Sequence, residues 1–175
     1  MLPDITLRIE NLVKAMETIV MPAVDRENDL AMEQAQLIIG HLKLLNTQWD
    51  MAYLYEKQAL EEIKSLARDL LSVSAGGLKT QSARQEVDAA INSVPESLPY
   101  TSTAINRYAV SLGNAVDALI YACHDDGTPD FKQHMGKLMI AAGEKYVMRE
   151  RVWFQGTGLD PEPKSLPSIE AMLNG

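Results

Sequence analysis

The fold is decided by one long stretch, DRENDLAMEQAQLIIGHLKLLNTQWDMAYLYEKQALEEIKSLARDLLSVS, which runs from Asp25 to Ser74. It contains no proline and a single glycine, Gly40. Apolar residues recur in it every seven positions, in neighbouring rows. One such row is Ala31, Ile38, Leu45, Ala52, Ala59 and Leu66. Rows with this spacing predict a wide apolar stripe on a helix and not a strand.

The length of this stretch raises the question of whether it forms one helix or two. An unbroken helix would run roughly 70 Å, whereas a compact domain of this size has a radius of gyration of about 16 Å. Because the rows keep their phase throughout, the sequence favours one continuous helix, half of which a second subunit would cover. A break at Asn46-Thr47 is the alternative, since Thr47 and Asp50 have the spacing of a capping box.

A fourth row with the same spacing is polar. Its members are Gln34, His41, Gln48 and Tyr55. Buried polar groups must find hydrogen-bond partners or they destabilise the fold. One interpretation places this row at the margin of the stripe, with His41 hydrogen-bonded within or beside the core. The other makes the row the polar lining of an internal site that binds a small ligand.

The remaining segments predict further helices separated by turns. Their approximate ranges are 4–21, 82–93, 103–123 and 128–154. Asp4 and Thr128 are expected to cap the first and last of these helices, and Asp25 is expected to cap the long stretch. We expect Gly113 to mark a close helix crossing and residues 124–127 to form a turn. The sequence therefore predicts an all-α protein: an up-and-down helical bundle (residues 1–155) with a long second helix, followed by a docking tail (residues 156–175). That tail is expected to be extended and to end in a short helix.

Composition narrows the classes of partner. A net charge of −8 over 175 residues argues against nucleic acid or an anionic membrane. The N-terminus lacks a signal-peptide pattern, and no window approaches the roughly 18 apolar residues of a membrane span. We therefore expect a cytoplasmic protein without a cofactor.

The single cysteine, Cys123, lies on an apolar helix face and is expected to belong to the core.

The strongest metal candidates are four residues around one acidic segment, His124, Asp126, Asp130 and His134. A mixed set of histidine and carboxylate ligands suits zinc, manganese or iron. The same residue types are also ordinary in a turn followed by a capped helix. The second interpretation is favoured, so the sequence predicts no tightly bound metal here.

Aromatic residues beside arginine are typical of interface hot spots. Arg149, Trp153 and Phe154 fit this description, and Met172 and Leu173 form an apolar end to the tail. These five residues are the candidates for an interface with a protein partner or with a second copy of the chain.

One resemblance is carried by residues 12–25, LVKAMETIVMPAVD, and residues 35–45. This opening resembles that of an uncharacterised bacterial helical family, which occurs near acyl-CoA dehydrogenase and aminoglycoside-phosphotransferase-like proteins. The resemblance implies an accessory role and assigns no site residues. The sequence as a whole predicts a non-enzymatic interaction or accessory protein that forms a homodimer. The alternative is a bundle, with or without enzymatic activity, that binds a small ligand along the polar row.

Overall fold

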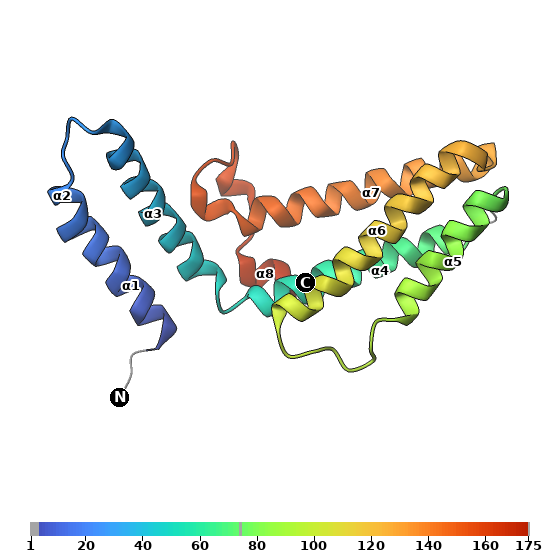
Figure 1. Cartoon of the computed structure of the whole chain (residues 1–175), viewed down its shortest axis with the longest axis horizontal. Coiled ribbons are helices and arrows are strands. Elements are labelled where there is room, and N and C mark those ends of the chain that lie inside the picture. The colour runs from blue at the N-terminus through green and yellow to red at the C-terminus, as the bar shows by residue number, and fades with distance from the viewer. Residues whose placement is uncertain (1–3, 74, 175) are drawn as a thin grey trace. The chain divides into compact units, whose positions relative to one another are not determined.

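The computed structural model describes residues 4–73 and 75–174, and most of these residues are helical (Figure 1). The described residues contain no β-strand, and their extended pairing is limited to an isolated bridge between Gly76 and Gly127. The prediction of an all-α protein is confirmed. Ser74, the predicted end of the long stretch, lies outside the described residues.

The elements follow one another along the chain with short connections. They are α1 (Ile5–Ala15), the π-helix η1 (Met16–Val20), α2 (Met21–Ala23), α3 (Asp29–Gln48), α4 (Ala52–Leu71), α5 (Leu78–Asn92), α6 (Ser102–Asp126), α7 (Pro129–Trp153), the 3-10 turns η2 (Gln155–Thr157) and η3 (Pro163–Ser165), and α8 (Ile169–Asn174). Contacts divide the described chain into two compact units. Unit 1 holds residues 4–51 and 150–174, and unit 2 holds residues 52–149. The predicted division at residue 155 differs from this one and stays a prediction.

The long stretch is not one continuous helix. α3 ends at Gln48 and α4 begins at Ala52, and between them the N–H of Met51 donates to the carbonyl of Gln48 at 3.0 Å. The prediction of continuity is therefore wrong, and the break lies just after the alternative at Asn46-Thr47. The seven-residue rows persist across the break although the two helices use them differently: Ile38 and Leu45 are exposed on α3, whereas Leu66 is buried on α4. Phase alone cannot distinguish that arrangement from an unbroken helix.

The predicted cap of the long stretch is also corrected. Asn28 caps α3 by accepting a hydrogen bond from the N–H of Ala31 at 3.1 Å. Asp25 instead accepts from the N–H of Glu27 at 3.0 Å, which closes the turn before the helix. Both side chains are short acceptors that suit turns as well as caps, so the sequence offers two candidates for one position.

Unit 1 is built on a hairpin of α1 and α3. Asp4 caps α1, as predicted, by accepting from the N–H of Leu7 at 2.8 Å. The two helices pack together, with Ile9 of α1 and Ile39 of α3 buried. The tail is held by a two-pronged ion pair, in which the Arg151 guanidinium donates to the Asp160 carboxylate at 2.8 and 3.0 Å.

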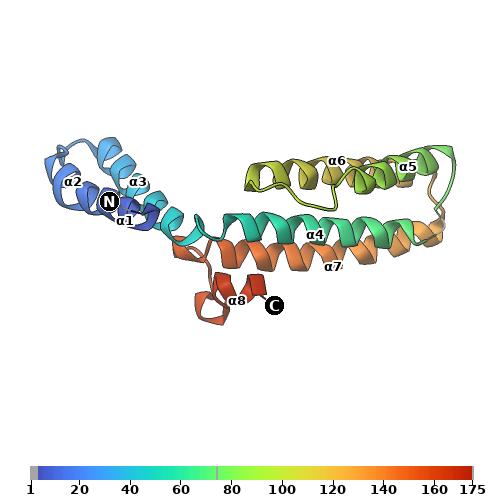
Figure 2. The same ribbon diagram turned by 90° about the horizontal axis from the view of Figure 1, so that it is seen from below.

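Unit 2 contains α4, α5, α6 and the part of α7 up to residue 149. α6 packs against α4 and α5, and Figure 2 shows α7 running alongside α4. The buried core takes side chains from all four helices, among them Leu66, Val87, Leu119 and Phe131. Cys123 belongs to this core, as predicted, and burial raises the pKa of its thiol.

Polar groups hold two helix ends of unit 2. The Arg84 guanidinium donates to the carbonyls of Leu70, Leu71 and Val73 at 2.9, 2.6 and 2.7 Å, which satisfies the C-terminal end of α4. The residues predicted as a turn, 124–127, are instead the last turn of α6 and its C-cap. Helix continues there because the Asp126 carboxylate accepts hydrogen bonds from the first turn of α5, which stabilises the acidic end of α6.

Two glycines differ in what surrounds them. At Gly76, φ is +148°, and an added Cβ would lie 2.7 Å from the Asp126 carbonyl oxygen. Glycine is therefore required by both backbone conformation and close approach. At Gly113, an added Cβ would meet nothing within 4 Å. The prediction of a close helix crossing at Gly113 is wrong.

Candidate functional site

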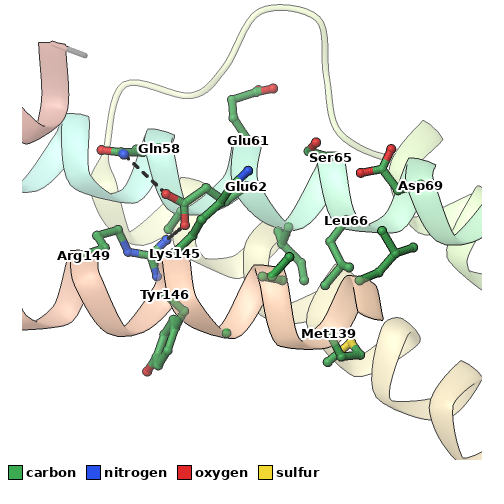
Figure 3. A pocket seen from close by; sticks show the side chains of 16 residues that line it. Gln58, Glu61, Glu62, Ser65, Leu66, Asp69, Met139, Lys145, Tyr146 and Arg149 are labelled. Atoms are coloured by element: carbon green, nitrogen blue, oxygen red, sulfur yellow. Dashed lines mark hydrogen bonds and ion pairs between the residues drawn. The ribbon is translucent and has the colours of Figure 1, made fainter. Parts of the chain in front are cut away.

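A groove of about 590 Å³ lies between α4 and α7 within unit 2 (Figure 3). Both helices contribute its walls, with side chains that are small or apolar in the middle and polar or charged at the ends and rim. The lining residues from α4 are Gln58, Ala59, Glu61, Glu62, Ile63, Ser65, Leu66 and Asp69, and those from α7 are Leu138, Met139, Ala141, Ala142, Gly143, Lys145, Tyr146 and Arg149. Ligand sites commonly combine such an apolar lining with a few convergent polar groups.

One end of the groove holds an ion pair between a buried arginine and a partly exposed glutamate. The Arg149 guanidinium donates to the Glu62 carboxylate, and Gln58 Nε2 donates to the same carboxylate at 3.3 Å. Figure 3 shows these three side chains converging between the two helices. The rings of Tyr55 and Tyr146 lie 5.2 and 5.3 Å from the Arg149 guanidinium, within the range of a cation–π contact. The pair therefore joins α4 to α7, and two tyrosine rings flank its guanidinium.

The middle of the groove is apolar. Its floor carries Ile63 and Leu66 from α4 and Leu138 and Met139 from α7. Small residues leave the space open, because alanine and glycine do not reach across it. At Gly143, for example, an added Cβ would meet nothing within 4 Å.

The remaining charges at the groove fall into a paired set and an unpaired set. Glu61 forms an ion pair with Lys64 at 2.8 Å. Lys145 and Asp69 form no ion pair with any described residue, and both side chains belong to exposed residues. In Figure 3, Lys145 lies near Glu62 and Arg149 at one end, whereas Asp69 lies at the other. The two ends of the groove therefore differ in electrostatic character.

The structure does not bring the polar row together at this groove. Gln34 and His41 are exposed on α3, whereas Gln48 Nε2 donates to the carbonyl of Trp153 at 2.8 Å. Tyr55 stands on α4 in the other unit, against Arg149. The prediction that His41 is hydrogen-bonded in or beside the core is wrong, because seven-residue spacing fixes a row along a helix but not its depth. The use of this row as a ligand site stays a prediction.

The four metal candidates are spread over two helices. Asp126 accepts the hydrogen bonds of α5 described above, His124 and Asp130 are exposed, and His134 is half-buried. Within residues 4–73 and 75–174, no group of three or more histidine, cysteine or acidic residues is arranged to hold a metal ion. Hydrogen bonding lowers the pKa of Asp126, first through the Thr80 hydroxyl and also through backbone N–H groups. This carboxylate therefore acts in the structure as a helix cap.

The interface candidates differ in their exposure. Arg149 is only 7% exposed and Trp153 is also buried, so both are covered by their own chain. Phe154 is exposed, and Met172 and Leu173 are half-buried. The signal that marked Arg149 as a candidate, arginine beside aromatic residues, reflects an internal cation–π cluster.

Comparisons with known proteins give no relative. No protein-family model matches the chain, and neither curated proteins nor solved structures match it. Among the helices that the structure describes, none is both long and apolar enough to cross a bilayer.

Proposed function

We propose that this chain is an interaction or accessory protein that forms a homodimer through one face of the α1–α3 hairpin. The observation that carries the proposal is a set of exposed aliphatic side chains at seven-residue spacing on both helices. We call this set the hairpin face. It consists of Ile5 and Leu12 on α1 and Ile38 and Leu45 on α3, which are 47%, 55%, 48% and 47% exposed.

Helical geometry places these four residues on one side of the hairpin. Ile5 and Leu12 lie one turn before and after the buried Ile9, and Ile38 lies one turn after the buried Ala35. Each row therefore borders the residues that face the other helix, and it borders them in the same rotational sense. The chain reverses direction between α1 and α3 (Figure 1), so the two rows meet on a common surface.

The opposite side of the hairpin is polar. Glu10, Lys14, Glu17 and Lys43 line the other seam between α1 and α3. Lys43 and Glu17 form an ion pair there at 2.6 Å. The hairpin is therefore amphipathic as a whole, with a charged surface that suits water and an apolar surface that suits a protein contact.

A second copy of the chain is the occupant that fits this face. Two such hairpins, related by a twofold axis, would form a four-helix bundle with heptad packing. The whole side of the hairpin that carries this face is about 30 Å long, the length of the 20-residue α3, and roughly 20 Å wide, which offers on the order of 600 Å² per protomer. That area is at the lower end of stable interfaces, which bury about 1,200–2,000 Å² in total. The adjacent row on α3, Leu30 and Leu37, is also exposed and would extend the contact.

Sedimentation equilibrium at tens of micromolar tests the dimer. We expect a species of twice the 19.4 kDa chain mass, and we expect Ile38→Asp and Leu45→Asp to convert it to a monomer with unchanged helix content. Ile140→Asp is the matched control, because Ile140 is an aliphatic residue on α7 in unit 2 that is 68% exposed. A single species of 19.4 kDa for the unmodified chain would overturn the proposal.

The order of the helices and the role of the tail are also proposals. We propose that the helices follow an up-and-down order, since short connections favour antiparallel neighbours. Phe154, Met172 and Leu173 stay predicted parts of the interface. Deletion of residues 157–175 tests the tail: a weaker dimer supports its participation, and an unchanged dimer leaves the hairpin face as the interface and removes the tail from it.

Small-ligand binding is the second candidate function, and the groove between α4 and α7 favours it. Its volume lies within the roughly 300–1,000 Å³ that is typical of ligand sites, and Gln58, Glu62 and Arg149 converge at one end of it. In this second proposal the ligand binds in the groove of unit 2 and not along the polar row. Native mass spectrometry of the purified protein would detect a retained ligand as added mass, and binding that Ala142→Phe leaves unchanged would exclude the groove.

A further inference from the structure

We infer that the groove between α4 and α7 binds an elongated apolar molecule carrying one anionic group, with that group at Lys145. The inference rests on the second candidate function and is independent of the dimer. It follows from the shape of the groove, from the way its charges cancel, and from the one cation that remains.

The groove is long and narrow. Its lining on α4 runs from Gln58 to Asp69, which corresponds to about 16 Å along a helix axis. Between those ends the floor is made of Ile63, Leu66 and Met139 together with small side chains. An apolar chain would remove this surface from water, which favours binding. The shape therefore favours a linear ligand.

At the polar end of the groove, one lysine has no ion-pair partner among the described residues. Glu62 is paired with Arg149, and Glu61 is paired with Lys64. Each pair is neutral as a whole. Lys145, which lines the same end of the groove, forms no ion pair with a described residue. An anionic group on the ligand would supply its missing counter-ion.

The other end of the groove sets the direction of the ligand. Asp69 lines it and forms no ion pair among the described residues. An anion placed beside Asp69 would be repelled, whereas the apolar end of the ligand would carry no charge there. The anionic group therefore belongs at Lys145, with the chain extending past Leu66 toward Met139. Figure 3 shows Lys145 and Asp69 separated along the groove.

Lys145 and not Arg149 is the residue to substitute. Arg149 is buried, holds Glu62 and contacts two tyrosine rings, so its loss would disturb the fold. Lys145 is exposed, so Lys145→Met removes the charge and keeps the length of the side chain. Lys137→Met is the matched control, because Lys137 is an exposed lysine on the same helix that does not line the groove.

The test is calorimetric titration of the full chain with three probes of equal chain length, below the concentrations at which they form micelles. The probes are dodecanoate, dodecan-1-ol and dodecyltrimethylammonium. We expect dodecanoate to bind most tightly, and we expect Lys145→Met to weaken it about three- to tenfold, as the loss of a partly exposed ion pair does. Lys145→Met should leave dodecan-1-ol unchanged, Lys137→Met should change nothing, and Lys145→Glu should make the ammonium probe the preferred one.

One further variant tests the apolar floor of the groove. Ala142→Phe narrows the apolar floor and should abolish binding of all three probes, with circular dichroism confirming that the chain is folded. Equal affinity for dodecanoate and dodecan-1-ol would overturn the anionic group while the groove remained a ligand site. Binding of none of the probes would overturn both the inference and the second candidate function. Dodecanoate binding that Lys145→Met leaves unaffected would also overturn the inference. So would dodecanoate binding that dissociates a dimer, because a second copy of the chain would then be the occupant of the groove.

Discussion

The carboxylate of Asp126 accepts hydrogen bonds from the backbone N–H groups of Lys79 and Thr80, at 2.8 and 3.0 Å. Asp126 is the last residue of α6, whereas Lys79 and Thr80 belong to the first turn of α5. The residue at the N-cap position of α5 is Gly77, which has no side chain to accept a hydrogen bond. The cap of α5 is therefore supplied by another helix, and it fastens α5 to α6 at that end.

Substitution of this cap should loosen the start of α5. We expect Asp126→Ala to lower the denaturant midpoint and to speed hydrogen exchange at the Lys79 and Thr80 amides, because two N–H groups lose their acceptor. Asp125→Ala is the control: Asp125 is exposed and pairs only with the Lys79 ammonium at 2.7 Å, so its loss should have a smaller effect. Equal effects of the two variants would contradict the role of Asp126 as the cap.

The same contact gives a pH dependence with a definite sign. The hydrogen bond from the Thr80 hydroxyl, with those from the backbone, lowers the pKa of Asp126 below its ordinary 3.8. A carboxyl whose pKa is lowered on folding contributes stability above its unfolded pKa, and this contribution is lost as the pH falls through the folded pKa. We therefore expect stability to decline below about pH 4. Unfolding measured between pH 2 and 7 should show a shallower decline for Asp126→Asn, and an unchanged decline would contradict the assignment.

Two glycine substitutions should have opposite signs. Gly76→Ala places a Cβ against the Asp126 carbonyl at a positive φ and should destabilise the chain by about 1–3 kcal/mol. Gly113→Ala meets nothing within 4 Å inside α6 and should stabilise it by about 0.5–1 kcal/mol. Thermal unfolding of the two variants measures both effects. A loss of stability in Gly113→Ala would restore the close crossing that the sequence predicted.

The fold class follows from the sequence because it depends on local pattern. Apolar spacing predicts the helices, and Asp4 and Thr128 cap α1 and α7 from the expected positions. The break at residues 49–51 does not follow, because the rows keep the same phase on both sides of it. The capping of α5 by Asp126 also does not follow, since it joins residues 46 positions apart. Contacts of that kind depend on tertiary packing and leave no periodic signal.

The candidate site was less accessible from the sequence. Glu62 and Arg149 are 87 residues apart, and each resembles an ordinary charge on a helix surface until the helices are packed. The polar row drew attention because its spacing is regular, yet Gln34 and His41 are exposed. A groove also requires side chains that fail to reach across it. Ala59, Ala142 and Gly143 show this only once their helices face one another.

The ion pair between Glu62 and Arg149 supplies the last prediction. Its Arg149 side chain is buried, so Glu62→Gln would take a hydrogen-bonded negative charge away from a cation in a poorly solvated place. We expect Glu62→Gln to destabilise the chain by about 1.5–3 kcal/mol, the usual contribution of a hydrogen bond to a charged group. Glu61→Gln is the matched control on the same helix. Its pair with Lys64 is partly exposed, so we expect a change within about 1 kcal/mol.

The double variant distinguishes the cost of breaking the pair from the value of the pair itself. Replacing both partners, as Glu62→Met with Arg149→Met, removes both charges and leaves apolar side chains of similar length. We expect this variant to be more stable than Glu62→Gln alone, because desolvation offsets much of the attraction in a buried pair. Urea unfolding of Glu62→Met, Arg149→Met and the double variant measures the coupling. A double variant clearly less stable than the unmodified chain would show that the pair stabilises the α4–α7 contact by more than the cost of burying it.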